Sequence, residues 1–235
     1  MTRTIPLVAL TGAIAAAGFA AAPASALTGP HPTFTYVSHL EALLPTPDQL
    51  GRITRASAPM RVVGSAAELL DSAAGNLEPA RCMGAYEPGH REAYRVAGPT
   101  SVATQLVTDG KPGRARHFVN QTVLSAASPD AAAGQVRAST RAWSSCGERV
   151  VAHTDTSGAV TEWALGPAEL HRNDTVLVQR QVGRHVICER AMTAANGTAG
   201  AVIADVVACD LRGADPTGRA EQIAVAIAHN SQPAN

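Results

Sequence analysis

The sequence predicts an α+β fold, in which helices flank an antiparallel β-sheet. Three observations support this prediction. Helix signals occur between Ser38 and Ile53, a strongly capped helix lies in the middle of the chain at Ser128–Gly147, and another helix follows Asp215. Between Ser101 and Asp210, short runs of β-branched and apolar residues alternate with turn residues. Consecutive short strands joined by tight turns pair antiparallel, so we expect an antiparallel sheet.

The N-terminal residues have the features of a signal peptide. Arg3 precedes an alanine-rich apolar run from Ile5 to Ala22, and Ala24-Ser25-Ala26 forms a small-x-small cleavage site. We expect residues 1–26 to be removed and the mature chain to be secreted, or extracytoplasmic in the cell envelope. A membrane anchor is the alternative, but proline and glycine interrupt the run and alanine contributes little apolar surface. The first cysteine is Cys82, so lipid attachment at a new N-terminus is not expected.

The rest of the chain has the length of one domain with a sizeable core. We expect an irregular leader at 27–37, an α+β domain at 38–230 and a tail at 231–235. No later apolar run is long enough to cross a bilayer, so we expect no membrane span in the mature chain.

The charge balance and the aromatic content exclude some classes of partner. Lys and Arg together number 19, as do Asp and Glu, so no net field attracts nucleic acid. Aromatic residues make up 3% of the chain and offer few platforms for stacking bases or sugar rings. Nucleic acid is therefore not an expected partner. Lys111 is the only lysine, and the excess of arginine and alanine indicates a GC-rich bacterial source.

Two short helices are predicted at the start of the domain. Ser38 to Glu41 and Thr46 to Gln49 both have the capping-box spacing, and Pro45 divides the two helices. A third helix is expected at 65–75, with Leu69 and Leu70 facing inward.

The central helix has start and stop signals that agree. Ser128 is a good N-cap, Pro129 suits the first helical position and Gly147 can close the far end. Trp143 and Val136 lie on one face together with the small residues Ala132, Ser139 and Cys146. We predict Trp143 and Val136 as structural core residues.

The strands follow from period-two patterns and turn residues. We expect them at Ala93–Ala97, Ser101–Thr108, Arg116–Ser125, Arg149–Thr154, Val160–Leu165, Asp174–Val182, Arg184–Ala195 and Ala201–Asp210. The final helix opens at Asp215-Pro216, with Ile223 and Ile227 facing inward.

Four cysteines in an exported chain predict two disulfides, with three possible pairings. Structural zinc is the rival interpretation, but no two cysteines have C-x-x-C spacing. If Asn196–Ala201 closes a hairpin, positions that sum to 397 face each other, which places Cys188 opposite Cys209. Cross-strand neighbours lie within disulfide reach, and Cys82 then pairs with Cys146.

Several short motifs resemble, in the same order, those of the PknH-like extracellular sensor domain family. They are the LL-x-x-P segment at Leu43–Pro47, Met60, Cys82, the Q-x-V strand at Gln121–Val123, the W-x-x-C-G helix end at Trp143–Gly147, Cys188, the hairpin strand Val202–Cys209, and a closing helix with Ile223 and Ile227.

The resemblance covers roughly Leu40 to Ala228. It implies a sensor-like α+β domain at 38–230, the same two disulfides, and helices flanking a sheet that carries a surface cleft. The family includes outer domains of actinobacterial receptor Ser/Thr kinases and secreted or lipid-anchored envelope proteins. This chain lacks a kinase domain, a membrane span and a lipid-attachment cysteine, so we do not expect it to signal through an attached kinase.

No catalytic motif is present in the mature chain, and we predict no catalytic residue, cofactor or metal. His153 with Asp155 and Glu148 is the nearest approach to a cluster, and a solvated strand end explains it more simply. The other candidates for acid–base or metal chemistry are His117, His171 and His185, which only folding could bring together.

Two sets of charged residues are explained by structural roles and do not require a binding site. Cross-strand pairing or an exposed edge accounts for Asp205 with Glu189 and Arg190. Arg180 and Arg184 could bind an anion, although a solvated turn is commoner.

The sequence therefore favours a non-enzymatic envelope domain that binds an unknown small molecule, cell-envelope component or protein. A secreted hydrolase or metal-dependent enzyme, in which the histidines converge, is the second hypothesis. A protein-interaction module with an exposed apolar patch is the third. The ligand-binding residues are not identifiable from the sequence.

Overall fold

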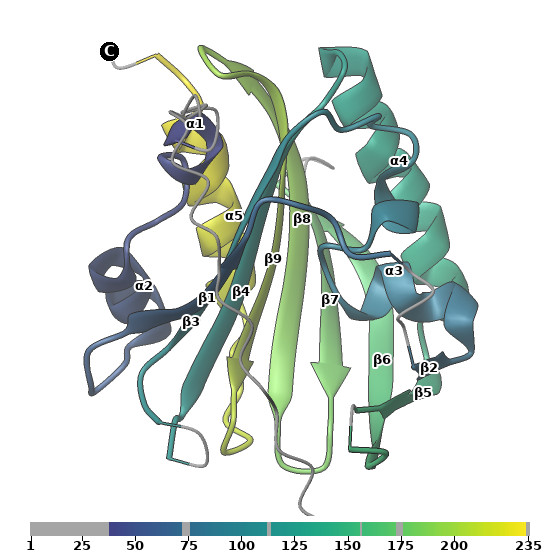
Figure 1. Cartoon of the computed structure of the whole chain (residues 1–235). Helices are drawn as coiled ribbons and strands as arrows, with labels where there is room; N and C mark the ends of the chain where they lie inside the picture. Colours follow the sequence, from purple (N-terminus) through teal and green to yellow (C-terminus); the bar gives the residue numbers. More distant parts are fainter. Residues whose placement is uncertain (1–37, 72–75, 112–113, 156, 173–175, 234–235) are drawn as a thin grey trace, which may run out of the picture. The chain divides into compact units, whose positions relative to one another are not determined.

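The computed structural model describes residues 38–71, 76–111, 114–155, 157–172 and 176–233, so the predicted signal peptide and leader lie outside the described residues. Within these ranges, nine antiparallel strands form one sheet in the order β1-β3-β4-β9-β8-β7-β6-β5-β2 (Figure 1). The strands are β1 (Arg61–Ala66), β2 (Leu77–Glu78), β3 (Val102–Thr108), β4 (His117–Ser125), β5 (Arg149–Thr154), β6 (Val160–His171), β7 (Val176–Val182), β8 (Ile187–Gly197) and β9 (Gly200–Asp210). The predicted α+β class is confirmed.

The path of the chain puts a late strand beside an early one. After the β3–β4 hairpin, α4 (Pro129–Cys146) connects to β5, near the opposite edge of the sheet. Strands β5 to β9 then follow one another back across the sheet as a meander, until β9 pairs with β4. The β8–β9 register brings Gly197 opposite Gly200 and Cys188 opposite Cys209, as the sequence predicts.

Alternation along β9 divides the core between the two faces of the sheet. Val202 and Val206 belong to a core that includes residues of α1 (Ser38–Glu41), α2 (Pro47–Thr54) and α5 (Arg219–Asn230), and we call this side the α5 face. Ile203 belongs to a second core with residues of α3 (Met83–Tyr86) and α4, on the α4 face. α5 packs on β8 and β9, and α4 packs on β8 and β6 from the opposite face; in Figure 1, α5 is seen to the left of α4.

On the α5 face, α2 begins as predicted, but α5 begins at Arg219, after the left-handed Gly218, and not at Asp215-Pro216. Thr46 accepts a hydrogen bond from the Gln49 N–H at 3.3 Å, and the Gln49 side chain accepts one from the Thr46 N–H at 2.7 Å, which completes a capping box. Ile223 and Ile227 of α5 are fully buried. Among the described helices, none is both long enough and apolar enough to cross a bilayer.

α4 is held at its start by a cap and along one face by the core. Ser128 Oγ accepts a hydrogen bond from the Ala131 N–H at 3.1 Å. Trp143 and Val136 are both buried, and the Trp143 indole donates to the Gly84 carbonyl at 2.9 Å. The far end differs in detail from the prediction, because Gly147 is extended and the left-handed conformation falls on Glu148 instead.

Two predicted elements are wrong. Residues 65 and 66, expected to start a helix, end β1 and pair with Gln105 and Thr104, because β-sheet pairing overrides the helix propensity of alanine. Leu69 is buried but Leu70 is exposed, and residues 72–75 lie outside the described part. The strand expected at 93–97 is the 3₁₀ helix η3 (Arg91–Tyr94) and a turn, because the Val96 and Ala97 N–H groups donate to the Gln135 side chain of α4.

β6 is longer than the sequence predicts, because Gly166-Pro167 does not end the strand. The register shifts between Leu165 and Ala168, and the pairing with β7 then continues to His171. A bulge is one of the few places where a sheet tolerates proline, which has no N–H to donate.

The two disulfides join Cys82 to Cys146 and Cys188 to Cys209. The first links the 3₁₀ helix η2 (Ala80–Cys82) to the end of α4 across 64 residues of sequence. The second bridges directly opposite residues of β8 and β9, whose Cα atoms are 4.0 Å apart.

Candidate ligand-binding site

One cross-strand row forms the floor of a pocket on the α4 face. Phe118 of β4 pairs with Cys209 of β9, Cys209 with Cys188 of β8, and Cys188 with Gln181 of β7. We call the cavity above this row the aromatic pocket. Its volume is about 230 Å³, and its lining is Tyr86, Glu87, Pro88, Phe118, Asn120, Trp163, Gln181, Val186, Cys188, Val207, Cys209 and Leu211.

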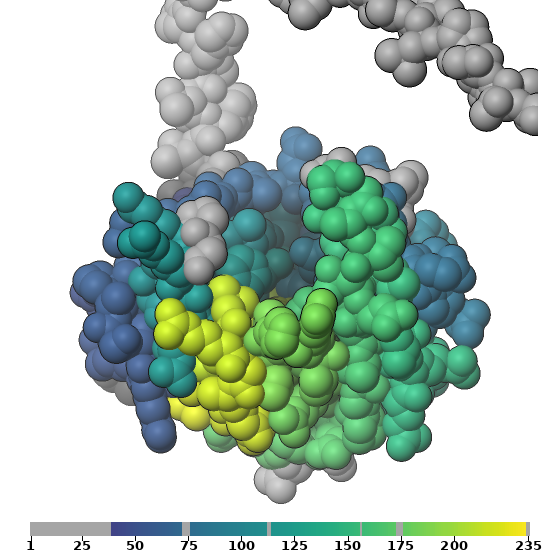
Figure 2. Space-filling model, turned by 90° about the horizontal axis from the view of Figure 1, so that it is seen from below, coloured from purple at the N-terminus to yellow at the C-terminus, as the bar shows by residue number. Residues whose placement is uncertain are grey.

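The pocket lies at the end of the sheet where β4 begins and β9 ends. Figure 2 looks toward this end and shows a hollow between the teal end of the β3–β4 hairpin and the green end of the β5–β6 hairpin. The lime and yellow segments after β7 and β9 form its near border. Helix α4 covers the neighbouring part of the same face, where its core lies against β6 and β8.

Aromatic residues gather at this pocket although the chain has few of them. Tyr86, Phe118 and Trp163 line it and are only half-buried. The other two aromatic residues in the described ranges, Tyr94 and Trp143, are fully buried in the core. Three of the five described aromatic rings therefore lie at one cavity and not in the core, and aromatic side chains are common in the lining of small-molecule sites.

The wall of the pocket is built by the segment after α3. The Gln181 amide donates to the Ala85 carbonyl at 3.0 Å and to the Tyr86 carbonyl at 2.8 Å, and so ties this segment to β7. The Tyr86 and Trp163 rings meet edge to face with centroids 5.7 Å apart. Burial, and to a lesser degree the Glu87 carboxylate, raises the pKa of Tyr86, so its hydroxyl stays neutral and can donate a hydrogen bond.

Polar groups at the pocket are few. Asn120 is buried, and its side-chain oxygen accepts only a long hydrogen bond of 3.4 Å from the Thr122 hydroxyl. Glu87 is the one charged residue in the lining, and its side chain is 42% exposed. A mostly apolar cavity with a few polar groups that can orient a ligand is the usual composition of a small-molecule site.

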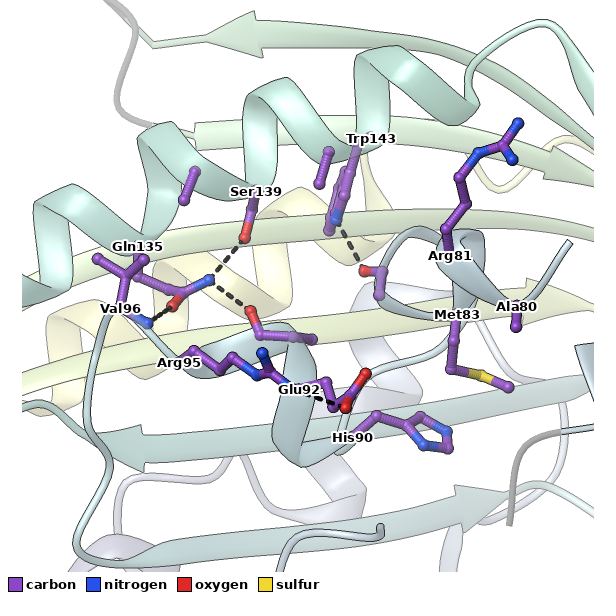
Figure 3. A pocket seen from close by; sticks show the side chains of 14 residues that line it. Ala80, Arg81, Met83, His90, Glu92, Arg95, Val96, Gln135, Ser139 and Trp143 are labelled. Atoms are coloured by element: carbon purple, nitrogen blue, oxygen red, sulfur yellow. Dashed lines mark hydrogen bonds and ion pairs between the residues drawn. The ribbon is translucent and has the colours of Figure 1, made fainter. Parts of the chain in front are cut away.

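A second cavity, of about 250 Å³, lies between α4 and the segment from η2 to η3. Figure 3 shows Gln135, Ser139 and Trp143 of α4 facing this segment. The Gln135 amide donates to the Ala93 carbonyl at 2.6 Å and to Ser139 Oγ at 3.0 Å, while its oxygen accepts from two backbone N–H groups. We call this cavity the helix pocket. Its buried amide group is already fully hydrogen-bonded within the protein, so the aromatic pocket is the stronger candidate.

A buried ionic network separates the aromatic pocket from the core. Asp205 receives two hydrogen bonds from the Arg190 guanidinium, at 3.0 and 2.7 Å, and a third from the Tyr94 hydroxyl at 2.6 Å. The guanidinium also donates to the Gly84 carbonyl at 2.8 Å and lies 4.4 Å from the centre of the Trp143 ring. All four side chains are buried. Cross-strand pairing is therefore the correct explanation for Asp205 and Arg190.

Glu189 points to the other face of β8 and has a different role. Its carboxylate accepts hydrogen bonds from the Gly218 and Ala220 N–H groups at the start of α5, at 2.8 and 2.7 Å. Burial raises its pKa, and these hydrogen bonds offset that effect only in part. The carboxylate is a cap for α5.

The predicted histidine candidates lie apart and have separate partners. His117 is buried with Nδ1 2.7 Å from Asp109 Oδ2, and His171 Nδ1 lies 2.9 Å from Glu221 Oε2. His185 is exposed in the turn between β7 and β8. Within the described ranges, no three His, Cys, Asp or Glu side chains are grouped so that they could hold a metal ion.

The trio of His153, Asp155 and Glu148 also separates. Asp155 accepts hydrogen bonds from Ser157 and from the Ala159 N–H in the β5–β6 turn, which lowers its pKa and agrees with the interpretation of this segment as a solvated strand end. His153, by contrast, packs on Tyr86 with ring centroids 5.4 Å apart, behind the wall of the aromatic pocket.

Arg180 and Arg184 are exposed and line different cavities, so they do not form one anion site. Between them, Gly183 packs against the Trp163 ring, where an added Cβ would come within 3.1 Å of a ring carbon. The turn therefore positions one of the rings of the aromatic pocket.

The sequence contains one signal that could have located this pocket. The predicted β8–β9 register and period-two alternation put Cys188, Cys209 and Val207 on one face. What it does not give is the pairing of β4 with β9, which adds Phe118 and Asn120, or the segment that carries Tyr86.

These features define a class, that of a disulfide-linked antiparallel α+β domain with a pocket on one face of its sheet. Residues 36–230 match the family described as the PknH-like extracellular domain. The chain belongs to this family, which confirms the resemblance of the motifs and the location outside the cytoplasm.

A solved structure has the same fold. The chain is similar to the crystal structure of the extracellular domain of PknH from Mycobacterium tuberculosis, with a TM-score of 0.71 and 23% sequence identity. The similarity covers 83% of this chain and 95% of that one. No curated protein matches this chain.

Proposed function

We propose that this chain is a sensor-like extracytoplasmic domain that binds a small ligand in the aromatic pocket, without catalysis. One observation carries the proposal: three half-buried aromatic rings line one cavity in a chain in which aromatic residues are 3% of the total. We propose residues 38–230 as the binding domain and residues 1–26 as a signal peptide that is removed.

The absence of catalysis is part of the proposal. In the described ranges, His117 and His171 lie with separate carboxylates, and neither lines the aromatic pocket. Glu87 is the one carboxylate in that lining, and His90, whose Nε2 lies 3.4 Å from Glu87 Oε2, is not part of the lining, so no acid–base pair faces the cavity.

A protein partner is the second candidate, because one part of the sheet exposes apolar side chains. Val150 of β5 and Val182 of β7 lie on either side of Ala164 of β6 in one cross-strand row, and Val160 is the first residue of β6. Val150, Val160 and Val182 are 60%, 63% and 38% exposed. Neighbouring exposed valines of this kind are a common feature of protein-interaction surfaces.

Native mass spectrometry of the protein purified from its own culture medium tests the proposal. We expect a retained small molecule on the wild-type chain and its loss in Val207→Phe, which fills the aromatic pocket from its floor. Ala138→Leu fills the helix pocket instead and is the matched control, so it should keep the added mass. Thermal unfolding of each variant checks that it is folded. A bare mass in every sample would contradict the proposal and favour the protein partner.

A further inference from the structure

The charge of the aromatic pocket is negative and comes from one residue. Its lining includes the Glu87 carboxylate and no lysine or arginine. His90 is the nearest partner, with Nε2 3.4 Å from Glu87 Oε2, and its other ring nitrogen is buried without a hydrogen-bond partner. Glu87 is therefore the one charged side chain that the lining presents to a ligand.

The rings of the pocket add to this negative potential. The face of an aromatic ring is electron-rich and attracts cations, and the attraction grows when water is excluded. Tyr86 and Trp163 form an edge-to-face pair beside Glu87, and Phe118 lies across the pocket floor from Trp163, with the row Cys209, Cys188 and Gln181 between them. The remaining lining is apolar or carries neutral amides.

The size of the pocket limits what can enter. A cavity of about 230 Å³ is below the range of roughly 300–1,000 Å³ that is typical of sites for drug-sized ligands. It fits a small molecule or the head of a longer one. An anion in this space would meet the Glu87 carboxylate and no lysine or arginine in the lining. Arg190, which interacts electrostatically with Glu87, already has Asp205 as its counter-ion, so a desolvated anion would lack compensation.

We infer that the aromatic pocket selects an organic cation, that is, an amine or quaternary ammonium group on a small apolar body. This inference rests on the proposed function, because it names the chemical class of ligand for the same pocket. Glu87 supplies the charge complement at the rim, and Tyr86, Trp163 and Phe118 supply the rings that contact the alkyl groups on nitrogen.

Three probes of nearly equal shape test the inference: choline, its neutral isostere 3,3-dimethylbutan-1-ol, and the anion 3,3-dimethylbutanoate. Isothermal titration calorimetry or ligand-observed NMR gives the dissociation constant of each for the full mature chain. We expect choline to bind about tenfold more tightly than the alcohol. We expect the carboxylate to bind more weakly than either.

Two carboxylate variants separate the role of Glu87 from a general charge effect. Glu87→Gln keeps the side-chain shape and should bring choline and the alcohol to within about threefold of each other. Glu92→Gln removes an equal charge from the exposed Arg95–Glu92 pair at the helix pocket and should leave the preference unchanged. Phe118→Leu, which keeps an apolar floor, should weaken choline more than the alcohol.

The outcomes distinguish this inference from the proposed function. If the alcohol binds as tightly as choline, the pocket binds small molecules but the inference of a cation is wrong. If none of the three probes binds, the inference is also wrong, and the retained mass in native mass spectrometry, which does not depend on these probes, decides the proposed function separately.

Discussion

The buried Arg190–Asp205 pair allows a quantitative prediction for stability. Both side chains are 0% exposed, and the carboxylate accepts three hydrogen bonds from Arg190 and Tyr94. Asp205→Asn keeps the volume but removes the charge, and it leaves a buried guanidinium without its counter-ion. Breaking a buried pair in this way typically costs about 3–5 kcal/mol, because the remaining charge stays desolvated.

An exposed pair with the same contact distance is the control. The N–O distance is 2.7 Å in both Arg190–Asp205 and Arg95–Glu92, but the latter side chains are 72% and 61% exposed. Solvent screens such a pair, so Glu92→Gln should cost about 0–1 kcal/mol. The difference between the two variants therefore measures burial, since the chemical change and the contact distance are matched.

Urea unfolding of the oxidised protein provides the assay. Far-UV circular dichroism is the main probe, because Arg190 lies against Trp143 and its loss can alter tryptophan fluorescence directly. Linear extrapolation gives the free energy of unfolding of each variant. The double variant Arg190→Met with Asp205→Leu should be at least about 2 kcal/mol more stable than the summed effects of Arg190→Met alone and Asp205→Leu alone predict. Equal costs for Asp205→Asn and Glu92→Gln, or strict additivity in the double variant, would refute the reasoning.

Three further predictions concern the frame of the domain. Replacing both Cys82 and Cys146 by alanine should lower the free energy of unfolding by about 4 kcal/mol, measured against the oxidised wild type in urea, because the 64-residue separation makes the unfolded chain much freer. Ser128→Ala should cost about 1 kcal/mol through the lost cap, whereas Ser144→Ala, at an exposed position in the same helix, should change stability by less than about 0.5 kcal/mol. Burial opposes the charge of Asp210, but hydrogen bonds from backbone N–H groups and an arginine outweigh it and lower its pKa. The ionised group therefore stabilises the fold above about pH 4 and loses this effect as pH falls through the lowered pKa, so an Asp210→Asn variant should show a shallower loss of stability between pH 5 and 2 in unfolding titrations. If the free energy of unfolding of the wild type fell no more steeply with pH than that of the variant, the result would contradict this prediction.

Local signals predicted most of the elements. The cap at Ser128 and the first-turn proline Pro129 predicted the first residue of α4 correctly. The spacing of Thr46 and Gln49 predicted a capping box, which forms with both hydrogen bonds. These features depend on neighbours within one turn of helix, so the sequence contains them in full. The β8–β9 register depends on a short hairpin and was predictable for the same reason.

The failures occurred where a distant partner decides the local structure. Ser65 and Ala66 have neighbours that favour helix, but β3 pairs with them. The segment at 93–97 looks like a strand, but Gln135, about 40 residues away, takes its N–H groups. No local pattern reports either partner, because each contact forms only when the sheet and α4 are in place.

The candidate site shows the same division between local and distant information. By itself the sequence determined the α+β class, the two disulfides and the burial of Trp143, because hairpin geometry, capping and helix periodicity are short-range. Only the tertiary structure decided that β9 pairs with β4, which brings Phe118 beside Cys209 and completes the floor of the aromatic pocket. That pairing joins two strands that are far apart in the sequence, His117–Ser125 and Gly200–Asp210, and are not connected by a short turn. Such a contact is set by how the whole sheet buries its two faces.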